Sequence, residues 1–214
     1  KQKKNILVEK PAFTNIQDFK IIKRLFENNK VFLTEGFMYR YLPYFQKIKD
    51  IIDNNNLGKV INMSSTFNIK VYKQKNFFGI KIRKPNYNHR LFNKDLGGGV
   101  ILDVGCYPLS LSTYINSITY KVETNDIHLE NVETENCDNG VDIYSTLKLN
   151  FSDKFYSKIT CSFKDQLNQN TKINFEHGSL NIEETWVPNQ NMSIEINNRD
   201  KKSKIDFLNN KNIY

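Results

Sequence analysis

The sequence predicts an α/β (α+β) fold, in which the remnant of a doubly wound domain precedes a mainly antiparallel open sheet with helices on one face. Two observations predict this class. A strand, a helix and a second strand follow one another near the start, and from Val60 onwards apolar residues recur with a period of two. We expect residues 1–42 to form the remnant and residues 43–214 to form the second domain.

The first part opens with Ile6-Leu7-Val8, a short apolar run typical of a parallel strand that is covered on both faces. Thr14 and Gln17 have capping-box spacing and predict the start of a helix. Its apolar stripe contains Phe19, Ile22, Leu25 and Phe26. Asn28-Asn29 ends the helix, and Val31-Phe32-Leu33 predicts the next strand. This order predicts a βαβ unit with parallel strands.

The second part contains two predicted helices. Pro43 favours a helix start, and Gly58 lies just past the expected end. The apolar face of this helix contains Tyr44, Ile48, Ile51 and Ile52. Residues 74–98 are expected to be irregular, and a second helix is expected from about residue 100 to residue 115, broken or kinked at Pro108.

Period-two alternation predicts the strands of the second part. One face of the first strand would carry Ile61, Met63, Ser65, Phe67, Ile69 and Val71. Further strands are predicted at residues 141–149, 155–163, 172–176, 179–183, 192–196 and 203–207. His177-Gly178 predicts a two-residue hairpin turn. Consecutive strands with short connections predict a mainly antiparallel sheet.

The composition excludes several classes of protein. With 39% hydrophobic and 25% charged residues, the chain is ordinary globular material. No apolar stretch is long enough for a membrane span, and no signal-peptide pattern follows the basic start. Cys106, Cys137 and Cys161 are far apart and odd in number, which disfavours a disulfide framework or a metal site and favours a cytoplasmic setting.

The charge is unevenly distributed along the chain. Residues 1–94 contain 20 Lys and Arg against 6 Asp and Glu, whereas the remainder contains 11 against 17. A basic half suits nucleic acid or cofactor phosphates, but these lysines are dispersed and no nucleic-acid motif accompanies them. We therefore expect a solvated surface and no nucleic-acid or membrane partner.

Three places carry residues with potential chemistry. Glu9-Lys10-Pro11 follows the first strand, at the edge where doubly wound sheets bind ligands, although a surface lysine before a turn proline is the simpler reading. Arg40 lies among aromatic residues after the second strand, where it would clamp a phosphate or a substrate hydroxyl, or else pack between domains.

The third place is a glycine run that precedes a polar pair. Gly97-Gly98-Gly99 would let another segment or a ligand approach the backbone at a helix start. Asp103 and Tyr107 are four residues apart and share one helical face in an apolar segment. They either serve a function or satisfy local hydrogen bonds.

Together these motifs resemble the Gfo/Idh/MocA family of NAD(P)-dependent oxidoreductases of sugars, inositols and diols. The resemblance rests on Ile6–Pro11, on Glu35–Pro43 and on Arg90 with Gly97–Pro108, in matching order and spacing. Tyrosine at position 107 resembles the branch of glucose-fructose oxidoreductase and the dihydrodiol and xylose dehydrogenases. The first domain is then the end of a Rossmann domain, and residues 43–214 form a substrate-binding and oligomerisation domain.

The resemblance implies roles for individual residues. Lys10 would lie by the nicotinamide of NAD or NADP and the reacting hydroxyl, with Glu9, Pro11 and Arg40 on the cofactor side and a commonly cis Lys10–Pro11 peptide. Asp103 and Tyr107 would touch the substrate, with Tyr107 exchanging the proton. A nearby ammonium group would stabilise the phenolate. His89 and Arg90 are further candidate substrate contacts.

The resemblance also implies what is missing. The glycine-rich pyrophosphate loop of the family is absent from this chain, so we expect a catalytic-domain fragment of an oxidoreductase that is inactive by itself. The sheet would form a homodimer or tetramer. The alternative is a non-catalytic relative that acts as an oligomerising scaffold or a ligand-binding module. Retention of Lys10, Asp103 and Tyr107 favours the enzyme.

Overall fold

The computed structural model describes residues 3–72, 74–77, 80–83, 85–121, 127–164, 168–187, 191–199 and 201–208. The chain divides into two compact units, Lys1–Met38 and Tyr39–Tyr214. In the described part of the chain, no helix is both long and apolar enough to cross a membrane.

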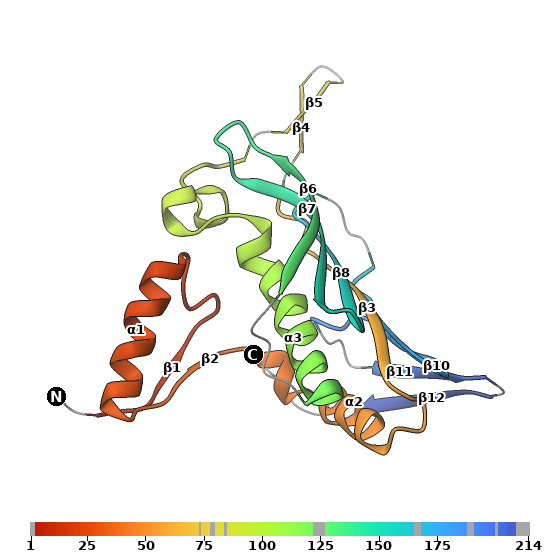
Figure 1. The fold of residues 1–214 in the computed structure, drawn as a ribbon. Coiled ribbons are helices and arrows are strands. Elements are labelled where there is room, and N and C mark those ends of the chain that lie inside the picture. The colour runs from red at the N-terminus through yellow and green to blue at the C-terminus, as the bar shows by residue number, and fades with distance from the viewer. Residues whose placement is uncertain are drawn as a thin grey trace. The chain divides into compact units, whose positions relative to one another are not determined.

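The first unit is the predicted βαβ unit. Strand β1 (Ile6–Val8) and strand β2 (Leu33–Glu35) are parallel neighbours, and helix α1 (Ile16–Asn29) connects them (Figure 1). The predicted capping box is wrong, because the N-cap is Asn15, whose side chain accepts a hydrogen bond from the Asp18 amide at 2.9 Å. The chain leaves the helix through Lys30 in the left-handed conformation, so β2 begins two residues later than predicted.

The second unit begins with short helical segments and contains most of the strands. Its helices are η1 (Met38–Tyr41, which begins at the last residue of the first unit), α2 (Pro43–Asn54), η2 (Arg90–Phe92), η3 (Lys94–Leu96), a π-helix (Ile101–Gly105) and α3 (Cys106–Tyr120). Its strands are β3 (Val60–Asn68), β4 (Gln74–Phe77), β5 (Ile80–Arg83), β6 (His128–Asn136), β7 (Asp142–Ser152), β8 (Phe155–Ser162), β9 (Thr171–Phe175), β10 (Gly178–Ile182), β11 (Asn191–Asn198) and β12 (Lys201–Leu208).

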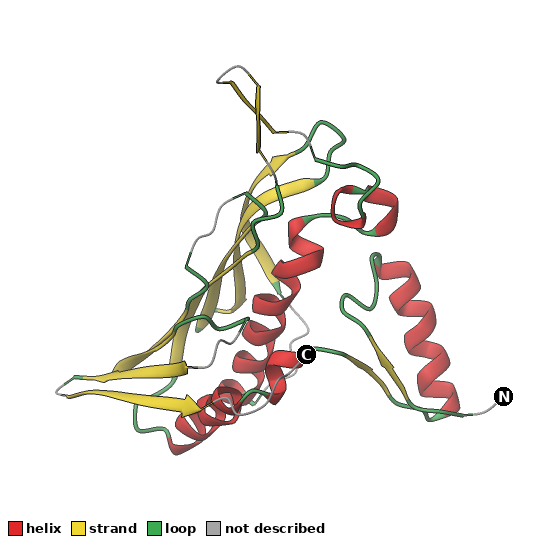
Figure 2. Cartoon of the chain, turned by 180° about the vertical axis from the view of Figure 1, so that it is seen from behind, coloured by secondary structure: helices red, strands yellow, loops and turns green. Residues whose placement is uncertain are grey.

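Eight strands form one open sheet in the order β12-β11-β10-β9-β3-β8-β7-β6 (Figures 1 and 2). All neighbours are antiparallel except β3 and β8. This parallel pair requires a crossover, which the chain makes through α3 and the β6–β7 hairpin. The predicted fold class is therefore confirmed.

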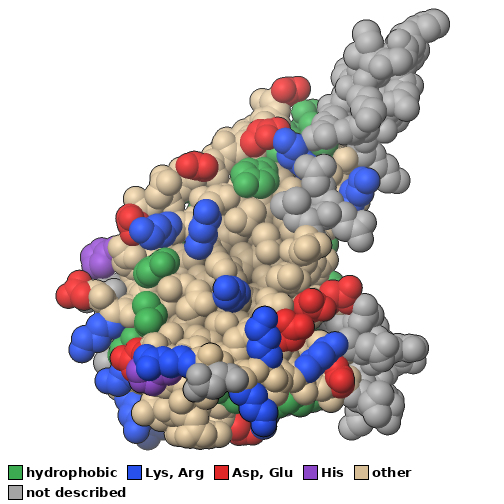
Figure 3. Space-filling view, turned by 90° about the vertical axis from the view of Figure 1, so that its right-hand side faces the viewer, with side chains coloured by type: hydrophobic (Ala, Val, Ile, Leu, Met, Phe, Trp, Pro, Cys, Tyr) green, Lys and Arg blue, Asp and Glu red, His purple; other side chains and the backbone are tan. Residues whose placement is uncertain are grey.

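Helices α2 and α3 cover one face of the sheet and enclose the core (Figure 2). The predicted apolar face of α2 is fully buried. Strand β8 alternates as predicted, with Phe155, Ile159 and Cys161 buried. Trp186, the single tryptophan, is completely buried in the same layer. The other face of the sheet is open and carries mostly uncharged polar side chains with scattered charges (Figure 3).

Several local predictions are corrected. Ile61 is 41% exposed because the β3–β9 register shifts between Val60 and Asn62, as in a β-bulge. Gly178 pairs with Phe175, so the hairpin turn consists of Glu176 and His177 and not of His177 and Gly178. Pro108 does not end the helix, because α3 runs from Cys106 to Tyr120, and the irregularity in the helical path is the π-helix that ends at Gly105, directly before α3.

The secondary structure of two segments was not predicted from the sequence. Strand β6 is exposed along its whole length and has no apolar alternation, because it lies at the edge of the sheet. Residues 74–98, expected to be irregular, contain the two-stranded β4–β5 hairpin as well as η2 and η3. Strand β6 contributes no buried alternating face that a pattern would reveal.

Candidate functional site

Asp103 and Tyr107 are positioned where the π-helix passes into α3. The π-helix adds one residue per turn to the helical path, and such insertions are frequent at functional sites. Both residues are almost fully buried, with Asp103 5% and Tyr107 6% exposed. Asp103 is thus a buried carboxylate that requires a partner.

Arg90 is that partner. Its guanidinium Nη1 donates to Asp103 Oδ1 at 3.0 Å, although its own side chain is 63% exposed. The pair joins η2 to the π-helix. It places one cation at the edge of the site and orients the carboxyl group, because charged hydrogen bonds are shorter and stronger than neutral ones.

The glycine run allows these two segments to come close. A Cβ on Gly98 would lie 2.8 Å from the Arg90 carbonyl oxygen, and the Gly99 amide donates to the Leu91 carbonyl at 3.0 Å. Gly97 and Gly99 also have positive φ angles. Of the two readings of this run, the approach of another chain segment is therefore observed in the described residues.

Tyr107 is packed among aromatic rings. Its ring centroid lies 5.2 Å from that of Phe67, 5.9 Å from Tyr39 and 6.0 Å from Trp186. Trp186 is itself anchored to strand β3, since its indole N–H donates to the Thr66 carbonyl at 2.9 Å. The ring of Tyr107 therefore has a fixed direction, as a residue with a positioned hydroxyl requires.

Arg40 and Tyr39 converge on α3 one turn beyond Tyr107. The Tyr39 hydroxyl donates to Ser110 Oγ at 3.0 Å, and Arg40 Nη2 donates to the same atom at 2.9 Å. Burial raises the pKa of Tyr39, and the hydrogen bonds with Ser110 and Arg40 oppose this rise. Arg40 thus lies beside the helix that carries Tyr107, with its side chain anchored by Ser110.

His89 has a local structural contact. Its Nδ1 accepts a hydrogen bond from the Leu91 amide at 3.4 Å and so caps η2. The residue itself is exposed next to Arg90. The structure therefore brings His89, Arg90, Asp103 and Tyr107 into one region of the second unit.

Lys10 lies in the first unit, immediately after β1. The Lys10–Pro11 peptide is cis, which confirms what the resemblance implied. The loop is tied to the end of β2, because the Ala12 amide donates to Glu35 Oε1 at 2.8 Å and the Gly36 amide donates to the Val8 carbonyl at 2.8 Å. Glu9, Lys10 and Pro11 therefore stand at the carboxyl edge of the parallel pair, as predicted.

Sequence reasoning missed the residues that surround the site. Phe67 was predicted only as a strand residue, and Trp186, Tyr39 and Ser110 were not singled out. A single tryptophan in the chain was the one available signal, because a large aromatic residue is usually buried where packing matters most. The contacts join residues far apart in sequence, so no spacing rule reveals them.

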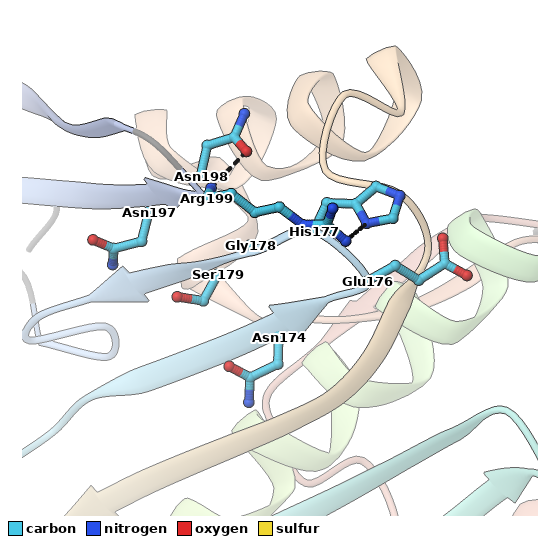
Figure 4. Close-up of a pocket in the computed structure, with 8 residues that line it drawn as sticks. All are labelled: Asn174, Glu176, His177, Gly178, Ser179, Asn197, Asn198 and Arg199. Atoms are coloured by element: carbon cyan, nitrogen blue, oxygen red, sulfur yellow. Dashed lines mark hydrogen bonds between the residues drawn. The ribbon is translucent and has the colours of Figure 1, made fainter.

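A separate hollow of about 380 Å³ lies on the open face of the sheet (Figure 4). Its lining consists of Asn174, Glu176, His177, Gly178, Ser179, Asn197, Asn198 and Arg199. Arg199 reaches over the strand ends to His177 Nδ1 at 3.0 Å. Asn174, Ser179 and Asn197 point to the same side from three adjacent strands. None of the predicted site residues lines this hollow.

Known proteins resemble this chain over most of its length. Trans-1,2-dihydrobenzene-1,2-diol dehydrogenase of Xenopus tropicalis is 26% identical over 206 residues, which are 93% of this chain and 54% of that enzyme. The NADP(+)-dependent D-xylose 1-dehydrogenase of Hypocrea jecorina is 30% identical over 107 residues, which are 50% of this chain and 26% of that enzyme. The chain therefore spans about half or less of the length of these relatives.

The fold is shared with solved structures. A 3-ketoreductase from Actinomadura kijaniata, in complex with NADP and TDP-benzene, matches with a TM-score of 0.75 and 18% identity, covering 95% of this chain and 57% of that one. The family model for the GFO/IDH/MocA C-terminal domain matches residues 45–181. Because this match takes in more than half of the 214 residues, the chain belongs to the GFO/IDH/MocA family.

Proposed function

We propose that this protein is an NAD(P)-dependent oxidoreductase that acts on a CH–OH group, or the corresponding carbonyl, of a sugar, inositol or diol. The observation that carries the proposal is the buried Asp103 carboxylate, held by Arg90 one helical turn before Tyr107. A scaffold gains nothing from a buried carboxylate next to an oriented phenol. The named relatives, which are diol and sugar dehydrogenases, support the same class of reaction.

In the proposed chemistry, the hydride of the C–H bond and the proton of the hydroxyl group are transferred to different acceptors. When bound, the nicotinamide takes up or gives the hydride of the reacting C–H bond. Tyr107 takes the hydroxyl proton during oxidation and returns a proton to the carbonyl oxygen during reduction. Asp103 accepts a hydrogen bond from a substrate hydroxyl, and Arg90 holds this side chain in place. His89 contributes a further polar contact to the substrate from the same region.

The first unit fits the nicotinamide side of a dinucleotide. Its parallel strands present Glu9, Lys10 and Pro11 at the carboxyl edge, where ligands of such sheets bind. Lys10 would supply the cation near the reacting hydroxyl, and Arg40 would supply a cation for a cofactor phosphate. The choice between NAD and NADP stays open, although one relative is named for NADP(+) and a fold neighbour was solved with NADP.

The first experiment is a titration of the protein with NADH and NADPH, followed by nicotinamide fluorescence. Turnover of aldoses, inositols and vicinal diols is then followed by absorbance. Both the 214-residue chain and the longest reading frame that contains it are assayed. We expect binding and turnover in the longer form and weak cofactor binding in the shorter one. Binding without turnover of any hydroxyl or carbonyl substrate would favour the ligand-binding alternative.

The catalytic assignment is tested by Lys10→Met and Tyr107→Phe. Each substitution should reduce turnover by about a hundredfold or more, because Tyr107 exchanges the proton and Lys10 supplies the nearby cation that stabilises its phenolate. The fold should remain, since both variants keep most of the side-chain volume. Gln46→Arg, on the exposed side of α2, serves as the control and should retain full turnover. Near-normal turnover in both test variants would refute the assigned roles.

We also propose that the protein forms a homodimer or tetramer through the open face of its sheet. The free thiols of Cys106, Cys137 and Cys161 support a reducing, cytoplasmic setting for the enzyme. The scaffold alternative uses the same face, so assembly alone does not distinguish the enzyme from the scaffold. Turnover of a substrate distinguishes them.

A further inference from the structure

We propose that Asp142 is a positioning residue for the site. It acts together with Asn139, from the turn that precedes β7. We call residues 137–142 the β6–β7 corner. This corner contacts both segments that carry site residues, namely η2 with Arg90 and the π-helix with Asp103. The inference rests on the proposed function for its catalytic meaning, but the contacts themselves are independent of it.

Asp142 caps the helical segment from a distance. Its Oδ2 accepts a hydrogen bond from the Ile101 amide at 2.8 Å. The N-cap residue, Val100, provides no side-chain hydrogen bond, so the acceptor comes from 41 residues further along the chain. The first amides of a helix have no internal acceptor, and a negative charge there is favourable. Asp142 therefore fixes the start of the segment that presents Asp103 and Tyr107.

Gly99 provides the space for this contact. A Cβ on Gly99 would lie 2.0 Å from Asp142 Oδ1, and the residue has a φ of +122°. Any other residue at position 99 would therefore displace the carboxylate and strain the backbone. The third glycine of the run is thus explained by a contact with Asp142, which the sequence did not reveal.

Asn139 holds the second segment. Its side-chain Nδ2 donates to the Phe92 carbonyl, the last residue of η2, at 2.7 Å. The corner is itself closed by hydrogen bonds from the Cys137 amide to the Val141 carbonyl at 2.8 Å and from the Gly140 amide to the Cys137 carbonyl at 2.9 Å. Figure 1 shows the β6–β7 connection next to the segment with η2 and η3. One rigid corner therefore sets the distance between Arg90 and Asp103.

This arrangement has a kinetic consequence. If the helix start moves, Asp103 and Tyr107 move together against Arg90 and against the substrate. A displacement of about 1 Å can cost about a hundredfold in rate. The binding of the cofactor should be unaffected, because the hydrogen bonds of Asp142 and Asn139 go to the Ile101 amide and the Phe92 carbonyl, in the segments that carry the proposed substrate contacts.

The test compares three variants. Asp142→Ala removes the acceptor, whereas Asp142→Asn keeps an acceptor oxygen and loses the charge. Asp138→Ala is the control, because Asp138 is an exposed carboxylate in the same corner whose side chain accepts from Tyr87 and not from the helix. We expect kcat/KM to fall at least about tenfold in Asp142→Ala, with an unchanged dissociation constant for NAD(P)H. We expect Asp142→Asn to recover most of it, because Asn and Asp are similar helix caps.

Amide hydrogen exchange of residues 99–107 provides a second readout that does not need turnover. Exchange should accelerate by about tenfold or more in Asp142→Ala and remain unchanged in Asp138→Ala. Unchanged exchange and unchanged kcat/KM in Asp142→Ala would overturn the inference. A wild-type protein without turnover, but with accelerated exchange in Asp142→Ala, would refute the proposed function and retain the positioning role. If Asp142→Ala does not fold, Gly99→Ala provides the test, because its Cβ would displace the Asp142 carboxylate. Unchanged exchange of residues 99–107 in that variant would overturn the inference.

Discussion

At the scale of single residues, the site depends on an ion pair with unequal exposure. Asp103 is buried, whereas Arg90 reaches it from the solvent-exposed side. Burial makes the carboxylate costly without a partner, and the exposure of Arg90 means that solvent screens part of the attraction. The pair therefore serves orientation more than stability.

Arg90→Gln tests this balance. Because the guanidinium is mostly exposed, the free energy of unfolding should fall by about 1 kcal/mol or less. KM for the substrate should rise about tenfold or more, because Asp103 loses the charged group that orients it. Urea unfolding and steady-state kinetics measure the two effects, with Lys94→Gln, an exposed neutralisation in η3, as the control. An unchanged KM would contradict the role of Arg90.

The cysteines differ in their expected reactivity. Burial, with a further contribution from the negative charge of Asp142, raises the pKa of Cys161 to about 12. Burial, with a contribution from Asp138, raises the pKa of Cys137 to about 11. Cys106 is only half-buried. Since the thiolate is the reactive form, a thiol reagent at pH 8 should modify Cys106 first and the other two only on unfolding.

The same pKa shifts have a consequence for stability. The pKa of both thiols is raised from 9.0 in the folded state, so the folded protein retains protons that the unfolded chain loses. The stabilisation is complete below pH 9 and declines as the pH rises towards 11 and 12. Urea unfolding across this range should show less of a decline in Cys161→Ala. An equal decline would contradict the assignment.

At the scale of elements, local sequence patterns predict that a helix begins but not which residue caps it. The Thr14–Gln17 spacing predicted a capping box, but Asn15 is the residue with extended backbone angles and a capping hydrogen bond. Asparagine caps at least as well as threonine, so two adjacent cap residues leave the choice to the geometry of the incoming chain. In the π-helix the acceptor is not local at all, because Asp142 supplies it.

Asn15→Ala should therefore destabilise α1, whereas Thr14→Ala should not. The loss of one N-cap costs about 1 kcal/mol, which corresponds to about a fivefold loss of amide protection in residues 16–29. Hydrogen exchange is the suitable measurement, because tryptophan fluorescence would report on Trp186, which belongs to the second unit. Equal losses in the two variants would show that Thr14 shares the capping role.

At the scale of the whole molecule, helices α2 and α3 leave the other face of the sheet uncovered in the described part of the second unit (Figure 3). Thr146 of β7 and Thr160 of β8 lie side by side towards the β6 edge, with their hydroxyls 3.4 Å apart, and Tyr156 is 39% exposed on the same face. Lys148 and Lys158 pair beside the two threonines on this face, so a second copy would meet uncharged hydroxyls together with these two charges.

Thr160→Arg should therefore weaken self-association. Two copies would bring like charges together, and Lys148 and Lys158 would add to the repulsion. We expect the dissociation constant from sedimentation equilibrium to rise about tenfold or more. Gln46→Arg adds the same charge on the helical side and should leave it unchanged. A monomeric wild-type protein at high concentration would contradict the proposed assembly.

The sequence by itself determined the parts that depend on neighbours along the chain. Apolar spacing predicted the βαβ unit, helix α2 and the strands with one buried face, such as β8. The motifs around Lys10, Asp103 and Tyr107 were sufficient to suggest the family, which the comparison confirms. The exposed strand β6 was invisible, because an edge strand without a buried face has no apolar period.

Only the tertiary structure decided the contacts between distant segments. It placed β3 beside β8 in parallel, packed Phe67 and Trp186 against Tyr107, and brought Asp142 to the helix start. Alternation specifies which face of a strand is buried but not which strand lies next to it. Those choices depend on how whole elements share one core, and for that reason the residues that hold the site in place could not be read from its motifs.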